Sequence, residues 1–478
     1  MADVAYYYGE QIPKFASGSK YIRKTLGKGY DYDDINKEVL LQSTVTDAGH
    51  LQLPSGMTYQ LLVLPQDDAQ MSLEVLQKIE YLLENGATIL GDKPKSVLGL
   101  KDYAERNAQL AQRADKIWNV KGEKQMIRHG RGTLFTGHTE KEILLAKGIV
   151  PDFQYTSREH VNLDYIHRQT ATEDVYFIRN QDSLAIDVLV SLRVTGAAPY
   201  TFDPEHGTID PVLTFSFSDN HISLPLQMEP WGSVFIVLKH DQKPLRSVVS
   251  ITKNGQNIPD DVATSLSLDG EGGLFFKASQ PGSYTITYAD NNYETLNYST
   301  PQEKQILNDS WDVHFPHGWG FEPIQHFDSL INWVDHAVPE LSIFSGSATY
   351  KKSFILDKEF LSDGVSYVLD LGTVGEVAQV FLNGHEVGTK VFPPFKFDIT
   401  GLLRTGHNHL SIAVANTWLN QLIGEAQKPL HQQRTRSNLS GSKADLTKRP
   451  WSNYKPQASG LIGPVIISGQ TKYRLPRE

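Results

Sequence analysis

The order of apolar and polar positions changes twice along the chain, and its first part alternates between strand and helix patterns. The clearest helix is "SLEVLQKIEYLLENG", which Ser72 caps at its start and Gly86 ends. Its apolar residues fall at helical spacing: Leu73, Leu76, Ile79 and Leu83. The other predicted elements are the strands "DVAYYYG", "YQLLVLP", "ATILGD" and "RGTLFTG", a turn followed by a helix in "YDYDDINKEVLLQS", and the helix "EKEILLAKG". Strands that alternate with helices indicate a parallel sheet. Residues 1–153 are therefore expected to form a doubly wound α/β domain.

The second part consists of short runs in which apolar and polar residues alternate. They include "VYFIRNQ", "IDVLVSLRVTG", "SVFIVLKH" and "GSYTITYA", and Gly, Asn, Asp and Pro separate them. This pattern is typical of an antiparallel sandwich, so residues 154–305 are predicted to be a β-sandwich domain. The stretch "TPQEKQILNDSWDVHF" is more polar and is predicted to be more helical, which places a boundary near residue 305.

The third part, residues 306–478, returns to a β pattern and is predicted to be a galactose-binding-like jelly-roll domain. Its runs include "SATYKKSFIL", "VSYVLDLGTV" and "HLSIAVANTW". Asn383 and Gly384 stand between two apolar runs, which is a strong hairpin signal. A long polar segment lies between Trp418 and Gly460, and a loop of that length is usually functional or disordered. The predicted fold class is therefore multidomain α/β plus all-β.

Composition excludes several classes of function. The chain has 478 residues, too many for one core, and its formal net charge of −10 argues against nucleic acid as a partner. It has no cysteine, which removes thiol nucleophiles, disulfides and thiolate metal sites. The first residues lack the pattern of a signal peptide, and no apolar run is long enough to span a membrane. Localisation stays open, with periplasm or secretion expected if the chain belongs to a longer precursor.

The stretch "DYIHRQTATEDVYFIRNQ" gathers polar side chains that suggest an active site, among them Asp164, His167 and Arg168. Within an alternating strand, Tyr165 and His167 share one face while Ile166 and Arg168 share the other, so the polar groups cannot all converge. A structural role at the edge of a sheet is therefore favoured, and replacing Arg168 by Ala is expected to lower the melting temperature.

Two further groups of residues have both a functional and a structural interpretation. Asp31, Asp33 and Asp34 in "GYDYDDIN" could bind calcium or cap the following helix, and capping is favoured because the spacing of a calcium loop is missing. No metal is assigned. The α/β region also lacks the glycine-rich motifs of nucleotide sites.

A sugar site is the second possibility, at one end of the jelly roll. The candidate residues are Asn416, Trp418, Asn420, Trp451 and Tyr454, because an aromatic plate can cover a sugar ring while amides pair with its hydroxyls. The same residues could equally form a packing surface, with Trp418 in the core.

The motifs together resemble the C-terminal, non-barrel half of α-L-rhamnosidases of glycoside hydrolase family 106. Those that carry the resemblance, in order, are "YYYGEQIP", "GYDYDDIN", "GIVPDF", "IHRQTATEDVYFIRNQ", "LPLQMEPWGSVFIVL" and "SGLIGPVII". The last unit also resembles the sugar-binding domain of β-glucuronidase-type enzymes. The resemblance implies an amidotransferase-like α/β domain, a β-sandwich and a jelly roll, with carbohydrate as the substrate class.

The resemblance also implies that the catalytic carboxylates lie in a barrel N-terminal to everything in this sequence. Three hypotheses follow. The chain is an accessory portion that docks on a catalytic barrel, or a stand-alone carbohydrate-binding protein, or an active glycosidase with a relocated site. In the last case Glu10, Asp31 or Asp33 would supply the acids.

Overall fold

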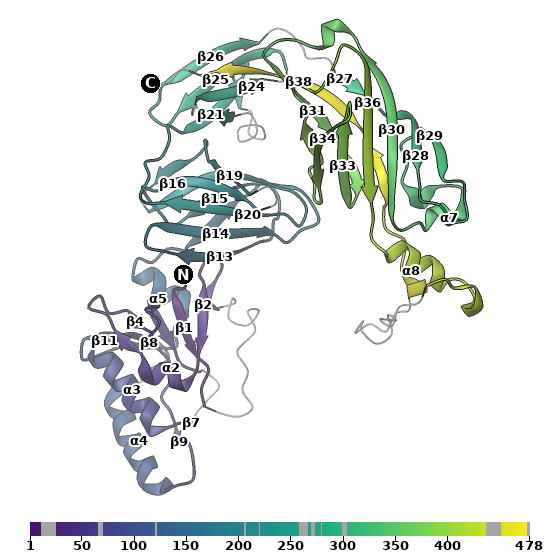
Figure 1. The fold of residues 1–478 in the computed structure, drawn as a ribbon. Coiled ribbons are helices and arrows are strands. Elements are labelled where there is room, and N and C mark those ends of the chain that lie inside the picture. Colours follow the sequence, from purple (N-terminus) through teal and green to yellow (C-terminus); the bar gives the residue numbers. More distant parts are fainter. Residues whose placement is uncertain are drawn as a thin grey trace. The chain divides into compact units, whose positions relative to one another are not determined.

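The computed structural model describes residues 1–10, 25–65, 70–119, 122–204, 207–218, 220–257, 266–268, 273–278, 280–298, 304–435 and 451–475. Within these ranges the protein is mostly β-sheet with few helices (Figure 1). It divides into two compact units, the first made of Met1–Val249 and Tyr288–Asn291 and the second of Ser250–Thr287 and Asn292–Glu478. The predicted mixture of α/β and all-β architecture is confirmed. No helix in the described ranges is long and apolar enough to cross a membrane.

The first unit begins with a six-stranded sheet in the order β10-β11-β8-β6-β1-β2. Its strands are β1 (Val4–Tyr7), β2 (Tyr32–Ile35), β6 (Leu61–Val63), β8 (Thr88–Leu90), β10 (Gln125–His129) and β11 (Gly132–Thr136). All neighbours pair in parallel except β10 and β11, which form an antiparallel hairpin. The parallel sheet predicted from the alternating pattern is therefore present.

Helices accompany this sheet, and small paired strands lie beside it. They are α2 (Lys37–Gln42), α3 (Leu73–Glu84), α4 (Tyr103–Ile117) and α5 (Glu140–Ala146), with β3 (Thr44–Val45), β4 (Leu51–Gln52), β5 (Thr58–Tyr59), β7 (Gln70–Met71) and β9 (Ser96–Val97). The predicted cap of α3 is confirmed, since the Ser72 side chain accepts from the Val75 N–H. Helix α4 was not predicted, because its apolar face is narrow and buries only Leu110, Ala114 and Ile117.

The rest of the first unit holds two antiparallel sheets, in the orders β12-β15-β19-β18 and β13-β14-β20-β16-β17. Their strands are β12 (Phe153–Thr156), β13 (Leu163–Gln169), β14 (Glu173–Asn180), β15 (Ile186–Leu192), β16 (Ala198–Asp203), β17 (Thr208–Pro211), β18 (Ser216–Ser218), β19 (His221–Met228) and β20 (Ser233–Lys239). Both sheets contribute to one hydrophobic core, with Tyr176 and Ile236 from one and Val190 and Leu224 from the other. Alternation along each strand sends these side chains to the same interior.

The second unit is built from antiparallel sheets, in the orders β22-β21-β25-β26, β23-β24-β38-β31-β35, β29-β28-β30-β36-β33-β34 and β32-β37. The strands are β21 (Val248–Lys253), β22 (Gln256–Asn257), β23 (Leu266–Leu268), β24 (Leu274–Ala278), β25 (Gly282–Tyr288), β26 (Tyr293–Tyr298), β27 (Lys304–Ile306), β28 (Asp309–His314), β29 (Ile324–Ser329), β30 (Ser347–Leu356), β31 (Val365–Asp370), β32 (Thr373–Gly375), β33 (Val377–Leu382), β34 (His385–Lys390), β35 (Lys396–Asp398), β36 (Gly406–Ala415), β37 (Gly460–Gly463) and β38 (Ile466–Arg474). Its helices and 3₁₀ turns are η1 (Trp333–Asp335), α7 (Pro339–Ser342), η2 (Lys358–Phe360), α8 (Leu419–Ala426), η3 (Leu430–Gln432) and η4 (Trp451–Asn453).

Two sequence expectations for the second unit have clear outcomes. The hairpin at Asn383 and Gly384 is confirmed, since both residues have positive φ and join β33 to β34. The helical interpretation of the stretch before Phe315 is wrong for its described residues, which begin at Lys304 and form β27 and β28. Trp311 and Val313 are fully buried on alternate positions of β28, which is the period of a strand.

The predicted domain limits at 153/154 and 305/306 stay predictions. Strand β24, which precedes residue 305, pairs with β38 near the end of the chain.

Candidate functional site

The polar stretch that first suggested an active site surrounds a buried histidine. His167 lies on β13 directly opposite Tyr176 on β14, and the two rings stack with centroids 3.9 Å apart. Its side chain is 1% exposed, whereas Arg168 lies on the opposite, exposed face of the strand. The separation of these two side chains follows from the period of the strand.

His167 bridges two buried carboxylates. Its Nδ1 is 2.9 Å from Asp152 Oδ2, and its Nε2 is 2.8 Å from Asp174 Oδ1. The Tyr176 hydroxyl donates to the other oxygen of Asp152 over 2.9 Å, and His240 Nε2 lies 2.6 Å from the other oxygen of Asp174. Each oxygen of both carboxylates therefore has a partner.

The hydrogen bonds within this cluster shift the pKa values of its members toward their charged forms. Burial lowers the pKa of His167, but the hydrogen bonds and charges of Asp152 and Asp174 outweigh burial and raise that pKa above its usual value. Burial raises the pKa of Asp174, and the bonds to His167 and His240 outweigh it, so that pKa is lowered. Both ring nitrogens of His167 face a carboxylate oxygen, an arrangement that suits the protonated ring and favours a structural role over proton transfer.

Arg193 links this cluster to Asp3, the residue directly before strand β1 of the parallel sheet. Its Nη2 donates to Asp3 Oδ1 over 2.8 Å, its Nη1 donates to the Val150 carbonyl over 2.7 Å, and its Nε lies 3.7 Å from Asp152 Oδ1. Arg168, by contrast, donates to the carbonyl of His167. The guanidinium that holds carboxylates here is thus Arg193, which the sequence analysis missed because its partners are distant along the chain.

A cavity of about 860 Å³ lies in the first unit beside Arg193. The charged side chains that line it are Asp3, Asp33, Arg168 and Arg193, and Tyr59 is among the hydroxyl-bearing ones. Asp33 accepts from the Tyr59 hydroxyl over 2.9 Å. The cavity offers mixed charge to a polar ligand, but each of its two carboxylates already has a partner of its own.

The acidic stretch at the second strand does not cap a helix as predicted. Asp33 and Asp34 lie on β2, and the cap of α2 is Asn36, whose side chain accepts from the Val39 N–H over 2.9 Å. A strand that was not predicted occupies these positions, so the helix begins beyond the aspartates. Neighbouring residues on a strand point to opposite faces, so Asp33 and Asp34 do not converge as calcium ligands. Glu10 binds the Ser72 N–H and Lys37.

The predicted sugar-binding residues lie around α8 in the second unit. Asn416 accepts from the Gly346 N–H and donates to the Phe344 carbonyl and to Ser459 Oγ. Asn420 is buried and donates to the Gln457 carbonyl and to the same Ser459 hydroxyl. Both amides therefore hold the backbone together.

The predicted aromatic residues of this surface differ from the amides. Trp418 directly precedes α8 without a side-chain capping bond and is 64% exposed, so the interpretation of Trp418 as a core residue is wrong. The rings of Trp451 and Tyr454 lie 5.5 Å apart, and η4, which includes Trp451, packs against α8. Residues 436–450 of the long polar segment lie outside the described residues.

Within the described residues, the potential metal ligands that come together are Glu80, Glu84 and His129. This group contains none of the three aspartates that were considered for calcium.

Comparisons with known proteins agree with the resemblance seen in the sequence. Residues 1–217 match a family model described as alpha-L-rhamnosidase, and residues 337–451 match one described as glycosyl hydrolase 2 galactose-binding domain-like. A protein of Formosa agariphila named "Putative beta-glucuronidase" is 24% identical over 657 residues, covering 98% of this chain and 55% of that protein.

The solved structure of a rhamnosidase from Novosphingobium sp. PP1Y is similar over almost the entire chain. It is 26% identical with a TM-score of 0.70, covering 98% of this chain and 39% of that chain. The chain thus spans about half the length of the curated relative and less of the rhamnosidase. Two regions of the chain are thus similar to the alpha-L-rhamnosidase family and to the galactose-binding-like domain of glycosyl hydrolases, and the resemblance predicted from the sequence is confirmed.

Proposed function

We propose that this chain is an accessory portion of an α-L-rhamnosidase-like glycoside hydrolase that acts in the breakdown of plant or microbial polysaccharides. The observation that carries the proposal is the match of 98% of the chain to only 39% of a rhamnosidase. The remaining part of such an enzyme would supply the catalytic acid and base. The three portions of this chain would be an amidotransferase-like α/β domain (1–153), a β-sandwich (154–305) and a jelly roll (306–478).

The state of the carboxylates in this chain supports the same proposal. Glycoside hydrolysis uses a pair of carboxylic groups roughly 5–9.5 Å apart that flank the bond to be cleaved. Most of the buried carboxylates in the described residues are held by charged partners instead: Asp152 and Asp174 by His167, and Asp3 by Arg193. Glu140 differs, because one of its oxygens accepts from the Tyr6 hydroxyl over 3.1 Å and the other has no hydrogen-bond partner. Glu425, also buried, is held by Lys428 over 2.8 Å. Such groups stabilise a fold and are poorly placed to meet a substrate.

The proposal is tested by hydrolysis of an aryl α-L-rhamnoside by the purified chain. We expect no release of the aryl group above the rate without protein. Turnover that persists through repurification and is lost in Asp33→Asn would overturn the proposal and place a relocated active site in the cavity. Asp33 is the residue to change because it lines that cavity. Asp312→Asn, at an exposed carboxylate of the second unit, is the matched control.

A second candidate function, carbohydrate binding by the second unit, is favoured by one observation. The Trp418 ring is 64% exposed at the start of α8, within the galactose-binding-like region. An exposed indole can cover the C–H face of a pyranose. With Asn416 and Asn420 engaged in backbone bonds, this contact would be mainly apolar, and affinity for one sugar should be weak, on the order of millimolar.

Calorimetric titration with rhamnose-containing oligosaccharides tests this second function. We expect binding to the wild type and its loss in Trp418→Ala. Trp451→Ala serves as the comparison, since Trp451 packs beside Tyr454 and is less exposed. Equal binding by the folded wild type and Trp418→Ala would exclude this surface.

A further inference from the structure

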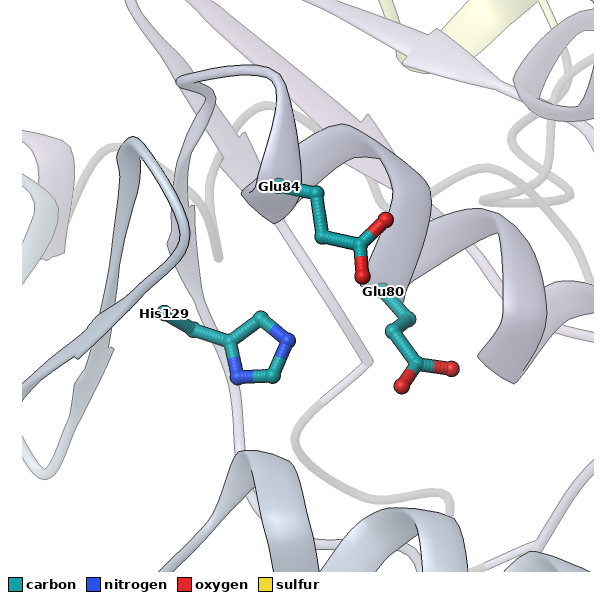
Figure 2. A group of neighbouring side chains, drawn as sticks. All are labelled: Glu80, Glu84 and His129. Carbon is teal, nitrogen blue, oxygen red and sulfur yellow. The ribbon is translucent and has the colours of Figure 1, made fainter.

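Three potential metal ligands from two elements meet on the surface of the α/β region. Glu80 and Glu84 come from α3, and His129 is the last residue of β10 (Figure 2). One ligand atom from each side chain lies within 4.8 Å of the others. The site is distinct from the His167 cluster and from the galactose-binding-like region.

The sequence and the backbone fix this arrangement. Glu80 and Glu84 are four residues apart in a helix, so both carboxylates project from one face. The turn after His129 is bound to the end of the same helix, because the Arg131 N–H donates to the Glu84 carbonyl over 3.2 Å. Gly130 has a φ of +56°, and a Cβ at that position would lie 2.5 Å from Glu84 Cα. The close approach of backbone to backbone therefore holds His129 beside the two glutamates.

We propose that Glu80, Glu84 and His129 bind one first-row divalent cation of the zinc type. Two carboxylates and one imidazole are a mixed oxygen and nitrogen set, and imidazole suits zinc, copper and nickel, whereas calcium takes oxygen ligands. Three protein ligands leave a position for water, as zinc sites with an open position do. A bound cation also removes the repulsion between two like charges four residues apart on a helix.

Arg113 is the competitor for this cation. Its Nη1 lies 2.5 Å from Glu80 Oε2, reaching across from α4. The guanidinium neutralises one of the two carboxylates and must be displaced, or must share Glu80, when a cation binds. Removal of Arg113 should therefore strengthen metal binding, which loss of folding could not do.

The test is calorimetric titration of the chain with zinc chloride, for the wild type and three variants. His129→Ala removes a ligand and should weaken the site at least about tenfold, since loss of a supporting group alone costs 10–100-fold. Arg113→Ala should raise the affinity for zinc by up to about fivefold, which corresponds to the free energy of a surface ion pair. His138→Ala is the matched control, because that imidazole is also half-buried in the same region and bonds the Thr136 carbonyl. The control is needed because the chain has 16 histidines that can bind zinc adventitiously.

A second readout is the melting temperature with and without zinc. Zinc should raise it for the wild type and for His138→Ala, and should raise it less for His129→Ala at the same concentration. The proposal is overturned if His129→Ala and Arg113→Ala both leave the zinc isotherm unchanged, or if His138→Ala weakens binding as much as His129→Ala. Tighter binding of calcium than of zinc would overturn the assigned class of metal.

Discussion

Replacement of His167 by Leu tests whether the buried charge cluster holds the first unit together. The side chains of His167, Asp152 and Asp174 are 1%, 3% and 2% exposed, so the substitution leaves two buried carboxylates without their shared cation. Breaking a buried ion pair from one side costs about 3–5 kcal/mol. Tyr176 and His240 still bind the two carboxylates, so a cost near the low end, about 3 kcal/mol, is expected.

The assay for this substitution is thermal unfolding followed by circular dichroism. For a unit of this size, each kcal/mol moves the melting temperature by about 2–4 °C, so a fall of about 6–12 °C is expected. Arg168→Ala is the matched control at the next residue. From the sequence, Arg168→Ala was expected to lower the melting temperature. Because the Arg168 side chain is exposed, the free energy of unfolding is now expected to change by less than about 0.5 kcal/mol. The reasoning is refuted if His167→Leu and Arg168→Ala have the same melting temperature.

The same cluster predicts how stability depends on pH. The pKa of His167 is raised from 6.5 in the folded protein, so its contribution is fully present below that value and is lost as pH rises through the raised pKa. The pKa of Asp174 is lowered, so its contribution is present above about pH 4 and is lost as pH falls through the lowered pKa. The wild type should lose more stability than His167→Leu between neutral and alkaline pH. Parallel pH profiles of the two proteins would contradict this assignment.

Three further substitutions separate structural residues from exposed ones. Asn420→Ala should destabilise the second unit by about 1–3 kcal/mol, since it removes one hydrogen bond each from the Ser459 hydroxyl and the Gln457 carbonyl and takes away the side-chain acceptor of the Gln457 N–H. An unchanged melting temperature would argue against that role. Trp418→Ala should change the free energy of unfolding by less than about 0.5 kcal/mol, as other surface substitutions do, because the ring is exposed. A large fall in melting temperature would show a packing role. Asn36→Ala should lower the free energy of unfolding by about 1 kcal/mol through loss of the helix cap, as measured by urea unfolding. If Asp34→Ala had that cost and Asn36→Ala had none, the aspartates would be the cap, as the sequence predicted.

Local patterns in the sequence predicted those parts of the fold that local physics decides. The cap and apolar face of α3, the hairpin at Asn383 and the opposite faces of His167 and Arg168 all depend on residues within a few positions of one another. Helix α4 has a largely polar surface, so the pattern of apolar residues did not reveal it.

Partners that are distant along the chain were beyond prediction from the sequence. Asp152 lies 15 positions from its partner His167, and His240 lies 66 positions from its partner Asp174. Arg193 and Asp3 are 190 positions apart. No local period records such contacts. The candidate amides Asn416 and Asn420 had the composition of a sugar site, but their hydrogen bonds to Ser459, 43 and 39 residues away, became visible only in three dimensions.

The most direct test of the central proposal is to incubate a rhamnose-containing oligosaccharide with an excess of the purified chain and to follow free rhamnose by proton NMR. Because the protein is in excess, even one turnover per molecule would be detected. The account predicts no rhamnose beyond that in a sample without protein, since the catalytic acid and base are proposed to lie outside this chain. Rhamnose released in proportion to the concentration of the chain would contradict it.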